Sequence, residues 1–163
     1  MAWTNDISKA NKNFDVLIHD LRFEALRRIK TVWFPVAQSG AHVHGLHPCL
    51  NLGVLSSAYT QVVLPYTISE VKEVTLRFIP TTTGTIDWTV NISSGVVDDD
   101  ESTATATKTE DGLSVTDDAI TEIDITSIFG TQKATEQIGV EFVLDAAATT
   151  TDVYVLGVFL KYV

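Results

Sequence analysis

Three histidines and the single cysteine of the chain fall close together, as His42, His44, His47 and Cys49. Imidazole and thiolate groups are good zinc ligands, and alternate positions of a strand or a tight loop can converge on one ion. The spacing matches no standard zinc module, and no second Cys/His cluster completes a site. These residues are therefore weak metal candidates, and a glycine-containing loop with surface histidines is the competing interpretation. In a trimer, histidines near the three-fold axis could also share an ion.

The same segment offers a second kind of chemistry. Cys49 with His47 or His44 could form a nucleophile–base pair, although catalytic pairs usually come from separate elements that hold both groups rigidly. The sequence contains no G-x-S-x-G, P-loop, H-E-x-x-H or dinucleotide-binding motif. We expect no enzymatic activity and no cofactor, and a metal-dependent enzyme built on this segment is the weakest alternative.

Acidic and aromatic residues give further candidates. The run from Asp98 to Glu101 could supply oxygen ligands for Ca²⁺, but it lacks EF-hand spacing, and a solvated loop tip is the preferred interpretation. Exposed aromatic side chains could stack on sugars. Trp88 lies at one of the alternate positions of its segment that are otherwise apolar and are expected to point inward, so we expect it in the core. Trp33 is ambiguous, and Trp3 is either an anchor or simply exposed.

Composition limits the classes of function. The 163 residues are 45% hydrophobic and 20% charged, which is typical of one folded domain. The formal net charge of −10 disfavours nucleic-acid binding. A single cysteine excludes an intrachain disulfide. The polar start has no apolar core of a signal peptide, and no apolar stretch is long enough for a membrane helix, so we expect no membrane association.

The chain changes character at residue 30. Residues 1–30 carry six basic and four acidic residues, whereas the remainder carries five basic and 17 acidic residues. Apolar residues of the first segment recur at three- and four-residue spacings, which predicts a helix with one apolar stripe. We therefore predict an anchoring or oligomerisation segment at 1–30. Its candidate interface residues are Phe14, Leu17, Leu21, Arg27 and Arg28.

Residues 31–163 follow a two-residue period. Val74, Leu76 and Phe78 alternate with polar neighbours, as an amphipathic strand does. About eight such strands predict an all-β fold, an antiparallel β-sandwich of the jelly-roll kind. The segment 81–84 is predicted to be a hairpin turn. The long last strand is predicted to lie mid-sheet, covered on both faces. The expected strands are 31–36, 59–64, 73–79, 85–92, 119–125, 138–144 and 152–162, with 102–107 as an edge strand or loop arm.

The phrase D-V-Y-V-L-G-V-F-L-K-Y at 152–162, with G-T-I-D-W-T-V-N-I-S at 84–93 and V-T-L-R-F at 74–78, resembles small β-sandwich virion proteins of tailed bacteriophages. The resemblance covers about residues 31–163. It implies a capsid cement or decoration protein, or a tail or fibre component, commonly a homotrimer that binds other virion proteins. It also implies assembly in the host cytoplasm, and it transfers no functional residues. A carbohydrate-binding or adhesin module, with a glycan as ligand, is the alternative.

Overall fold

The computed structural model describes residues 29–37, 42–66, 68–95, 106–130, 137–145 and 152–163. The chain divides into two compact units, residues 1–30 and 31–163. The helix expected before residue 29, with its five candidate interface residues, lies outside the described residues. Within the described part, no helix has the length and apolar character needed to cross a membrane.

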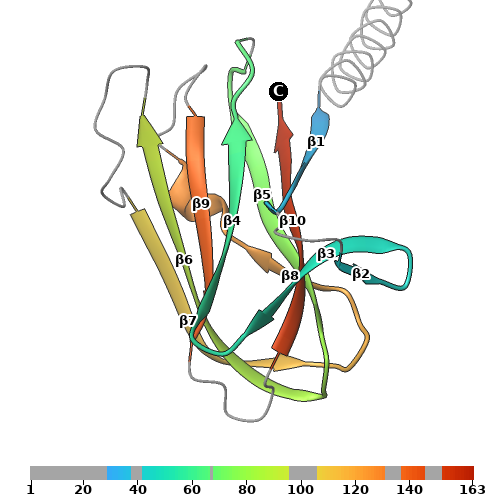
Figure 1. Cartoon of the computed structure of the whole chain (residues 1–163). Helices are drawn as coiled ribbons and strands as arrows, with labels where there is room; N and C mark the ends of the chain where they lie inside the picture. The colour runs from blue at the N-terminus through green and yellow to red at the C-terminus, as the bar shows by residue number, and fades with distance from the viewer. Residues whose placement is uncertain (1–28, 38–41, 67, 96–105, 131–136, 146–151) are drawn as a thin grey trace, which may run out of the picture. The chain divides into compact units, whose positions relative to one another are not determined.

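Ten strands and one short 3₁₀ helix make up the described part (Figure 1). The strands are β1 (Lys30–Pro35), β2 (His42–His44), β3 (His47–Gly53), β4 (Ser56–Val63), β5 (Val71–Pro80), β6 (Gly84–Gly95), β7 (Ala106–Val115), β8 (Thr121–Asp124), β9 (Gln137–Leu144) and β10 (Asp152–Tyr162). The 3₁₀ helix η1 (Thr126–Phe129) follows β8. In β4 and β9 buried and exposed residues alternate. Side chains of a strand point to opposite faces in turn, so one face of each of these strands meets the core and the other faces outward.

The strands form two sheets that pack face to face. One sheet has the order β2-β3-β10-β5-β8, with β1 also paired to β10, and the other has the order β4-β9-β6-β7. The pairs among β2 to β10 are antiparallel. Strands β3 to β10 thus supply four strands to each sheet. From β3 onward every connection crosses between the sheets except β6–β7. This is the strand order of a jelly roll, and it confirms the all-β sandwich expected from the sequence.

One local prediction was wrong. The segment 81–84 was expected to close a hairpin, but β5 lies in the six-stranded sheet and β6 in the four-stranded sheet. The turn therefore carries the chain from one sheet to the other. Turn residues signal a reversal of the chain, but they do not say whether the next strand pairs with the previous one.

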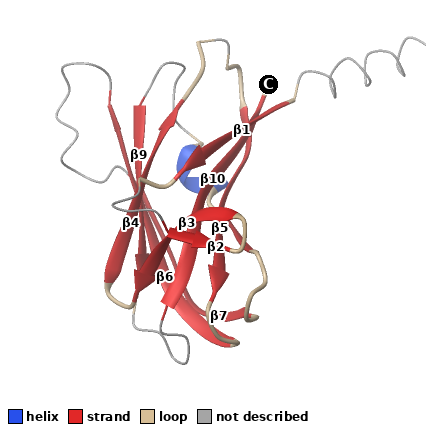
Figure 2. Ribbon diagram, turned by 45° about the vertical axis from the view of Figure 1, so that its right-hand side comes forward, coloured by secondary structure: helices blue, strands red, loops and turns tan. Residues whose placement is uncertain are grey.

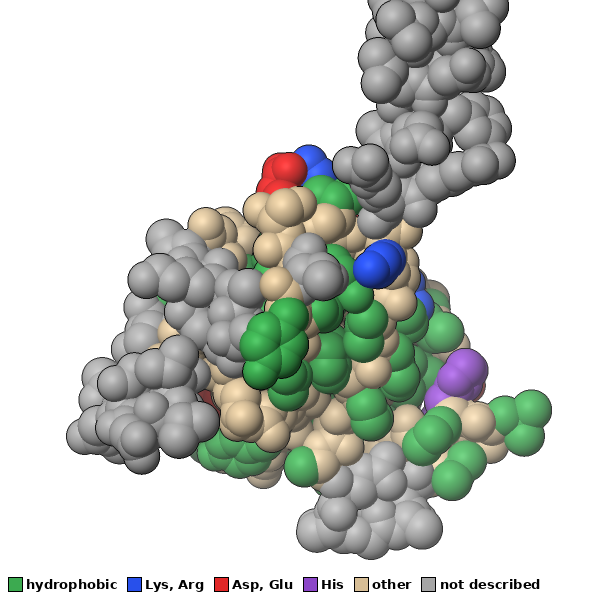
Figure 3. Space-filling model, turned by 90° about the horizontal axis from the view of Figure 1, so that it is seen from above, with side chains coloured by type: hydrophobic (Ala, Val, Ile, Leu, Met, Phe, Trp, Pro, Cys, Tyr) green, Lys and Arg blue, Asp and Glu red, His purple; other side chains and the backbone are tan. Residues whose placement is uncertain are grey.

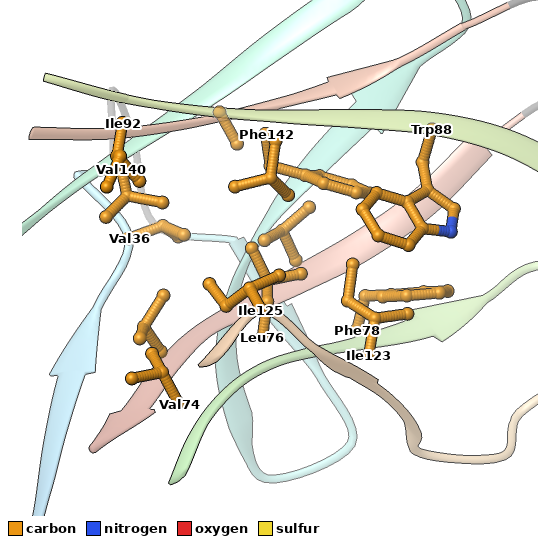
Figure 4. Close-up of a cluster of buried hydrophobic side chains, with 14 of the residues drawn as sticks. Val36, Val74, Leu76, Phe78, Trp88, Ile92, Ile123, Ile125, Val140 and Phe142 are labelled. Carbon is orange, nitrogen blue, oxygen red and sulfur yellow. The ribbon is translucent and has the colours of Figure 1, made fainter. Parts of the chain in front are cut away.

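The core lies between the two sheets (Figure 4). Phe78 of β5 and Phe142 of β9 face each other across it, with ring centroids 5.8 Å apart. Trp88 of β6 is fully buried there, as its inward phase predicted. Because burial of apolar surface is the main favourable contribution to folding, these facing side chains hold the sheets together.

Strand β10 runs through the middle of the six-stranded sheet and pairs with β1, β3 and β5. Val155 and Val158 face the core, whereas Leu156 packs on the opposite side of the sheet with Cys49 and Ile79. The central position and two-sided burial of the last strand are thus confirmed. Its outer side is packed at this point by residues of β3 and β5 within the same domain.

Candidate functional site

The six-stranded sheet carries a pocket of about 240 Å³, which we call the outer pocket. Its apolar and aromatic lining comes from Trp33, Pro35, Pro48, Ile120, Leu156 and Phe159, and its polar lining from His47 and Arg77. The walls therefore derive from β1, the β2–β3 hairpin, the β7–β8 connection, β5 and β10. Mostly apolar walls with a few polar groups are typical of a small ligand site or of a socket for a partner side chain.

A glycine in β10 allows β1 to form one wall. The register of β10 against β5 shifts between Val155 and Gly157, which marks a bulge. Gly157 has a φ of +149°, and a Cβ atom there would lie 2.3 Å from the carbonyl oxygen of Phe34. Since glycine lacks that atom, the backbone of β1 can lie directly against β10. Trp33 of β1 then meets Phe159 of β10, with ring centroids 4.3 Å apart and planes tilted by 46°.

Arg77 adds a cation to this aromatic wall. Its Cζ atom lies 3.6 Å from the centre of the Phe159 ring, a cation–π contact. Its Nη2 atom pairs with the Glu122 carboxylate at 2.5 Å, whereas its Nε atom is buried without a hydrogen-bond partner. The guanidinium is therefore fixed in position by Phe159 and Glu122. Such an arrangement can stack against a planar or ring-shaped group and donate hydrogen bonds to its edge.

The β2–β3 hairpin lies on the outer side of the six-stranded sheet (Figure 2), and its residues His47 and Pro48 line the outer pocket. His44 and His47 face each other across its turn. The Nε2 atom of His44 lies 3.0 Å from the Asp118 carboxylate, and the His44 ring stacks on Tyr154 at 4.4 Å. The β7–β8 connection and β10 therefore hold the hairpin in place. The sequence predicted this segment as a loop, so the strand pair was missed.

Cys49 lies in a small apolar cluster with Ile79 and Leu156. Burial raises the pKa of the Cys49 thiol, and a hydrogen bond from the backbone of His44 opposes this in part. The raised pKa keeps the thiol protonated, whereas nucleophiles and zinc ligands react as thiolates. In the part of the chain that the structure describes, no three His, Cys, Asp or Glu side chains gather as metal ligands. The side chain of His42 lies outside that part.

The outer face of the four-stranded sheet has a different character. Tyr59 donates a hydrogen bond to Glu141 at 2.8 Å, and Asn91 donates to the other Glu141 oxygen at 2.9 Å. Thr107 donates to the Asn91 side-chain oxygen at 2.8 Å. The bond from Asn91 is the main cause that holds the pKa of Glu141 below its ordinary value, and burial opposes it. One polar row thus joins β4, β9, β6 and β7.

Of the candidate residues taken from the sequence, the structure brings Trp33 and His47 into the outer pocket. Trp3 and the acidic run 98–101 lie outside the described residues. Sequence reasoning missed Arg77, Phe159 and Ile120. Arg77 and Phe159 occupy outward positions of their strands. The two-residue period of a strand predicts which face a side chain is on, but it does not predict which side chains of other strands lie next to it.

The comparisons with known proteins bear on the fold. No family model and no curated protein matches the sequence. Among solved structures, the insecticidal delta-endotoxin Cry8Ea1 from Bacillus thuringiensis is similar over 82% of this chain and 24% of its own, with 13% identity and a TM-score of 0.53. The present chain therefore spans about a quarter of the endotoxin.

Two further structures are similar at lower scores. A carbohydrate-binding module CBM36 in complex with calcium and xylotriose matches over 82% of this chain and 99% of its own, with 13% identity and a TM-score of 0.43. The structure of infectious bursal disease virus Gx strain matches over 83% of this chain and 32% of its own, with 16% identity and a TM-score of 0.37. At such identities, the likeness to the endotoxin shows a shared β-sandwich fold.

Proposed function

We propose that this chain is a non-enzymatic structural protein of a viral particle, either a capsid cement or decoration protein or a tail or fibre component. It works as an oligomer, with a trimer as the first expectation, bound to other virion proteins. Its place is the virion, assembled in the host cytoplasm. The observation that supports this is the division of the chain at residue 30 into a basic segment and an acidic jelly roll. Opposite charges favour attachment of the segment to neighbouring acidic copies.

The mass of the protein in solution tests this proposal. Sedimentation velocity of the full chain and of a variant lacking residues 1–28, which keeps β1 whole, gives the oligomeric state of each. We expect the full chain to sediment as an oligomer. The truncated variant should already be dissociated at protein concentrations at which the full chain remains assembled. A full chain that is a stable monomer, in the same oligomeric state as the truncated variant, would count against the proposal.

A second candidate function is glycan binding at the outer pocket. Trp33 is 37% exposed beside Phe159, and Arg77 offers hydrogen-bond donors next to both rings. Aromatic rings can stack on sugar faces, while polar groups at the side select their hydroxyls. A glycan array with the full chain tests this. Binding that is lost in Trp33→Ala and kept in Tyr66→Ala, a change at an exposed tyrosine that does not line the pocket, would favour the glycan.

A further inference from the structure

The tip of the β2–β3 hairpin presents an uncovered leucine. Leu46 is 95% exposed and Val43 is 63% exposed, and Gly45, with a φ of +60°, makes the tight turn that projects Leu46. Single exposed apolar side chains are ordinary, but these two stand beside a pocket whose rim includes the half-exposed Ile120. Figure 3 shows hydrophobic side chains projecting beside a histidine at the right-hand edge of the face seen from above. We call residues 43–47 the hairpin tip.

The hairpin tip does not fill the pocket beside it. His44 is tied to Asp118 and stacked on Tyr154, which holds the turn in place. Leu46 therefore stays exposed while the apolar walls of the outer pocket remain open. Among the described residues none covers these walls, which leaves them open to a side chain from another molecule.

The distribution of charge indicates what that molecule is. From Thr31 to Ser69 the sequence contains no Asp, Glu, Lys or Arg, although the whole chain carries a net charge of −10. This stretch includes the hairpin tip and the Trp33, Pro35 and Pro48 walls of the pocket. Two copies of an acidic protein repel each other wherever their acidic surfaces meet. Interface cores are depleted in charged residues, so this stretch can approach a like-charged copy at the lowest electrostatic cost.

The pocket's own charged groups do not change this conclusion. Arg77 is paired with Glu122 at its edge, and His44 of the hairpin with Asp118. A second copy would therefore meet an apolar socket whose Arg77 side chain already has a carboxylate partner. The 240 Å³ of the pocket accommodates one aliphatic side chain rather than a folded segment.

We propose that Leu46 of one copy inserts into the outer pocket of a second copy of this chain. Each copy both donates a hairpin tip and receives one, which a closed dimer or trimer satisfies. The inference rests on the oligomer of the proposed function and names one of its contacts. It makes the pocket a socket between copies, and a glycan at the same pocket becomes an alternative outcome of the test.

Substitution at the tip is the first test, by sedimentation velocity of the full chain over a concentration series. Leu46→Asp puts a charge into the apolar socket, and we expect the dissociation constant of the oligomer to rise at least ~10-fold. Leu55→Asp is the matched control, since Leu55 is also exposed and uncharged but lies at the β3–β4 turn with a φ of +60° that aspartate accepts. We expect the control to assemble like the wild type.

Cross-linking between copies is the second test. One preparation carries Leu46→Cys and another carries Ile120→Cys, and the two are mixed under a mild oxidant that accepts the two electrons of disulfide formation. We expect a covalent dimer in the mixture at a higher yield than in either preparation kept apart.

The outcomes separate this inference from the proposed function. An oligomer that Leu46→Asp leaves unchanged overturns the socket while the assembly role stands. A full chain that is monomeric at every concentration overturns both. Glycan binding that is lost in Trp33→Ala, with assembly unaffected by Leu46→Asp, assigns the pocket to the sugar instead.

Discussion

Gly157 of β10 lies so close to Phe34 of β1 that a Cβ atom at position 157 would be 2.3 Å from the Phe34 carbonyl oxygen. The same Cβ would lie 2.9 Å from the Pro35 Cα atom, so the obstruction is backbone and cannot rotate away. The φ of +149° adds a conformation that other residues rarely adopt. Both the path of β1 and the Trp33 wall of the outer pocket therefore depend on this glycine.

Gly157→Ala should destabilise the fold by about 2–4 kcal/mol, because the methyl group forces β1 off the sheet and the backbone of residue 157 into strain. Urea denaturation followed by tryptophan fluorescence measures the change. Gly139→Ala in β9 is the control, since the nearest atom to its Cβ is 3.8 Å away. A Gly157→Ala variant as stable as the Gly139→Ala variant would contradict this account of β1.

The layered fold could be predicted from the sequence, but the pairing of strands could not. The alternation of Val74, Leu76 and Phe78 follows from one wet and one buried face, so β5 is visible in the sequence. Trp88 was placed in the core by the same periodicity. The turn at 81–84 was misassigned because periodicity describes one strand at a time and carries no information about its neighbours in the sheet.

The outer pocket was beyond sequence reasoning for a related reason. Trp33, Arg77 and Phe159 stand on three strands that are distant in sequence, and they meet because β10 pairs with both β1 and β5. The hairpin at 42–53 was missed because its histidines, glycine and proline favour a loop by local preference. Tertiary contacts of His44 with Asp118 and Tyr154 override that preference.

Cys49 should react slowly with iodoacetamide in the native protein. Its side chain is buried and its thiol pKa is raised, so both access and thiolate content are low. We expect a rate about 100-fold below that of the unfolded chain, with reaction through local opening of the hairpin. The alkylated fraction is followed by intact mass against time. Equal rates in native buffer and in urea would contradict the buried position.

Asp118→Asn should accelerate this labelling of Cys49. The change removes the carboxylate that holds His44, and asparagine tolerates the φ of +56° at this position. Exposed ion pairs contribute up to about 1 kcal/mol, so the rate should rise about 2- to 5-fold as the hairpin opens more often. Asp117→Asn is the control, because the Asp117 carboxylate is next in sequence but is not the one paired with His44. Identical rates in the two variants would mean that the hairpin is held by the Tyr154 stacking and its strand pairing.

The polar row on the four-stranded sheet should make the free energy of unfolding depend on pH in the acidic range. Glu141 has a lowered pKa in the folded state, chiefly because Asn91 donates a hydrogen bond to its carboxylate. Its contribution to the free energy of unfolding is complete above the pKa of the unfolded chain and is lost as the pH falls through the folded pKa. Asp124, whose pKa is lowered mainly by the Thr126 hydroxyl, acts in the same direction.

Glu141→Gln should therefore lose less stability than the wild type when the pH is lowered from about 6 to about 3, since no charge remains at position 141 to be neutralised. Urea denaturation at each pH measures the free energy of unfolding. Asn91→Ala should act through the same carboxylate, because loss of the donor raises the folded pKa of Glu141. The free energy of unfolding should then fall less between about pH 6 and about pH 3 than it does in the wild type. Thr107→Val is the comparison, as its hydroxyl donates to Asn91 and not to Glu141. If Thr107→Val reduced the pH dependence of the free energy of unfolding as much as Asn91→Ala, that dependence would belong to the polar row as a unit rather than to the Asn91–Glu141 bond.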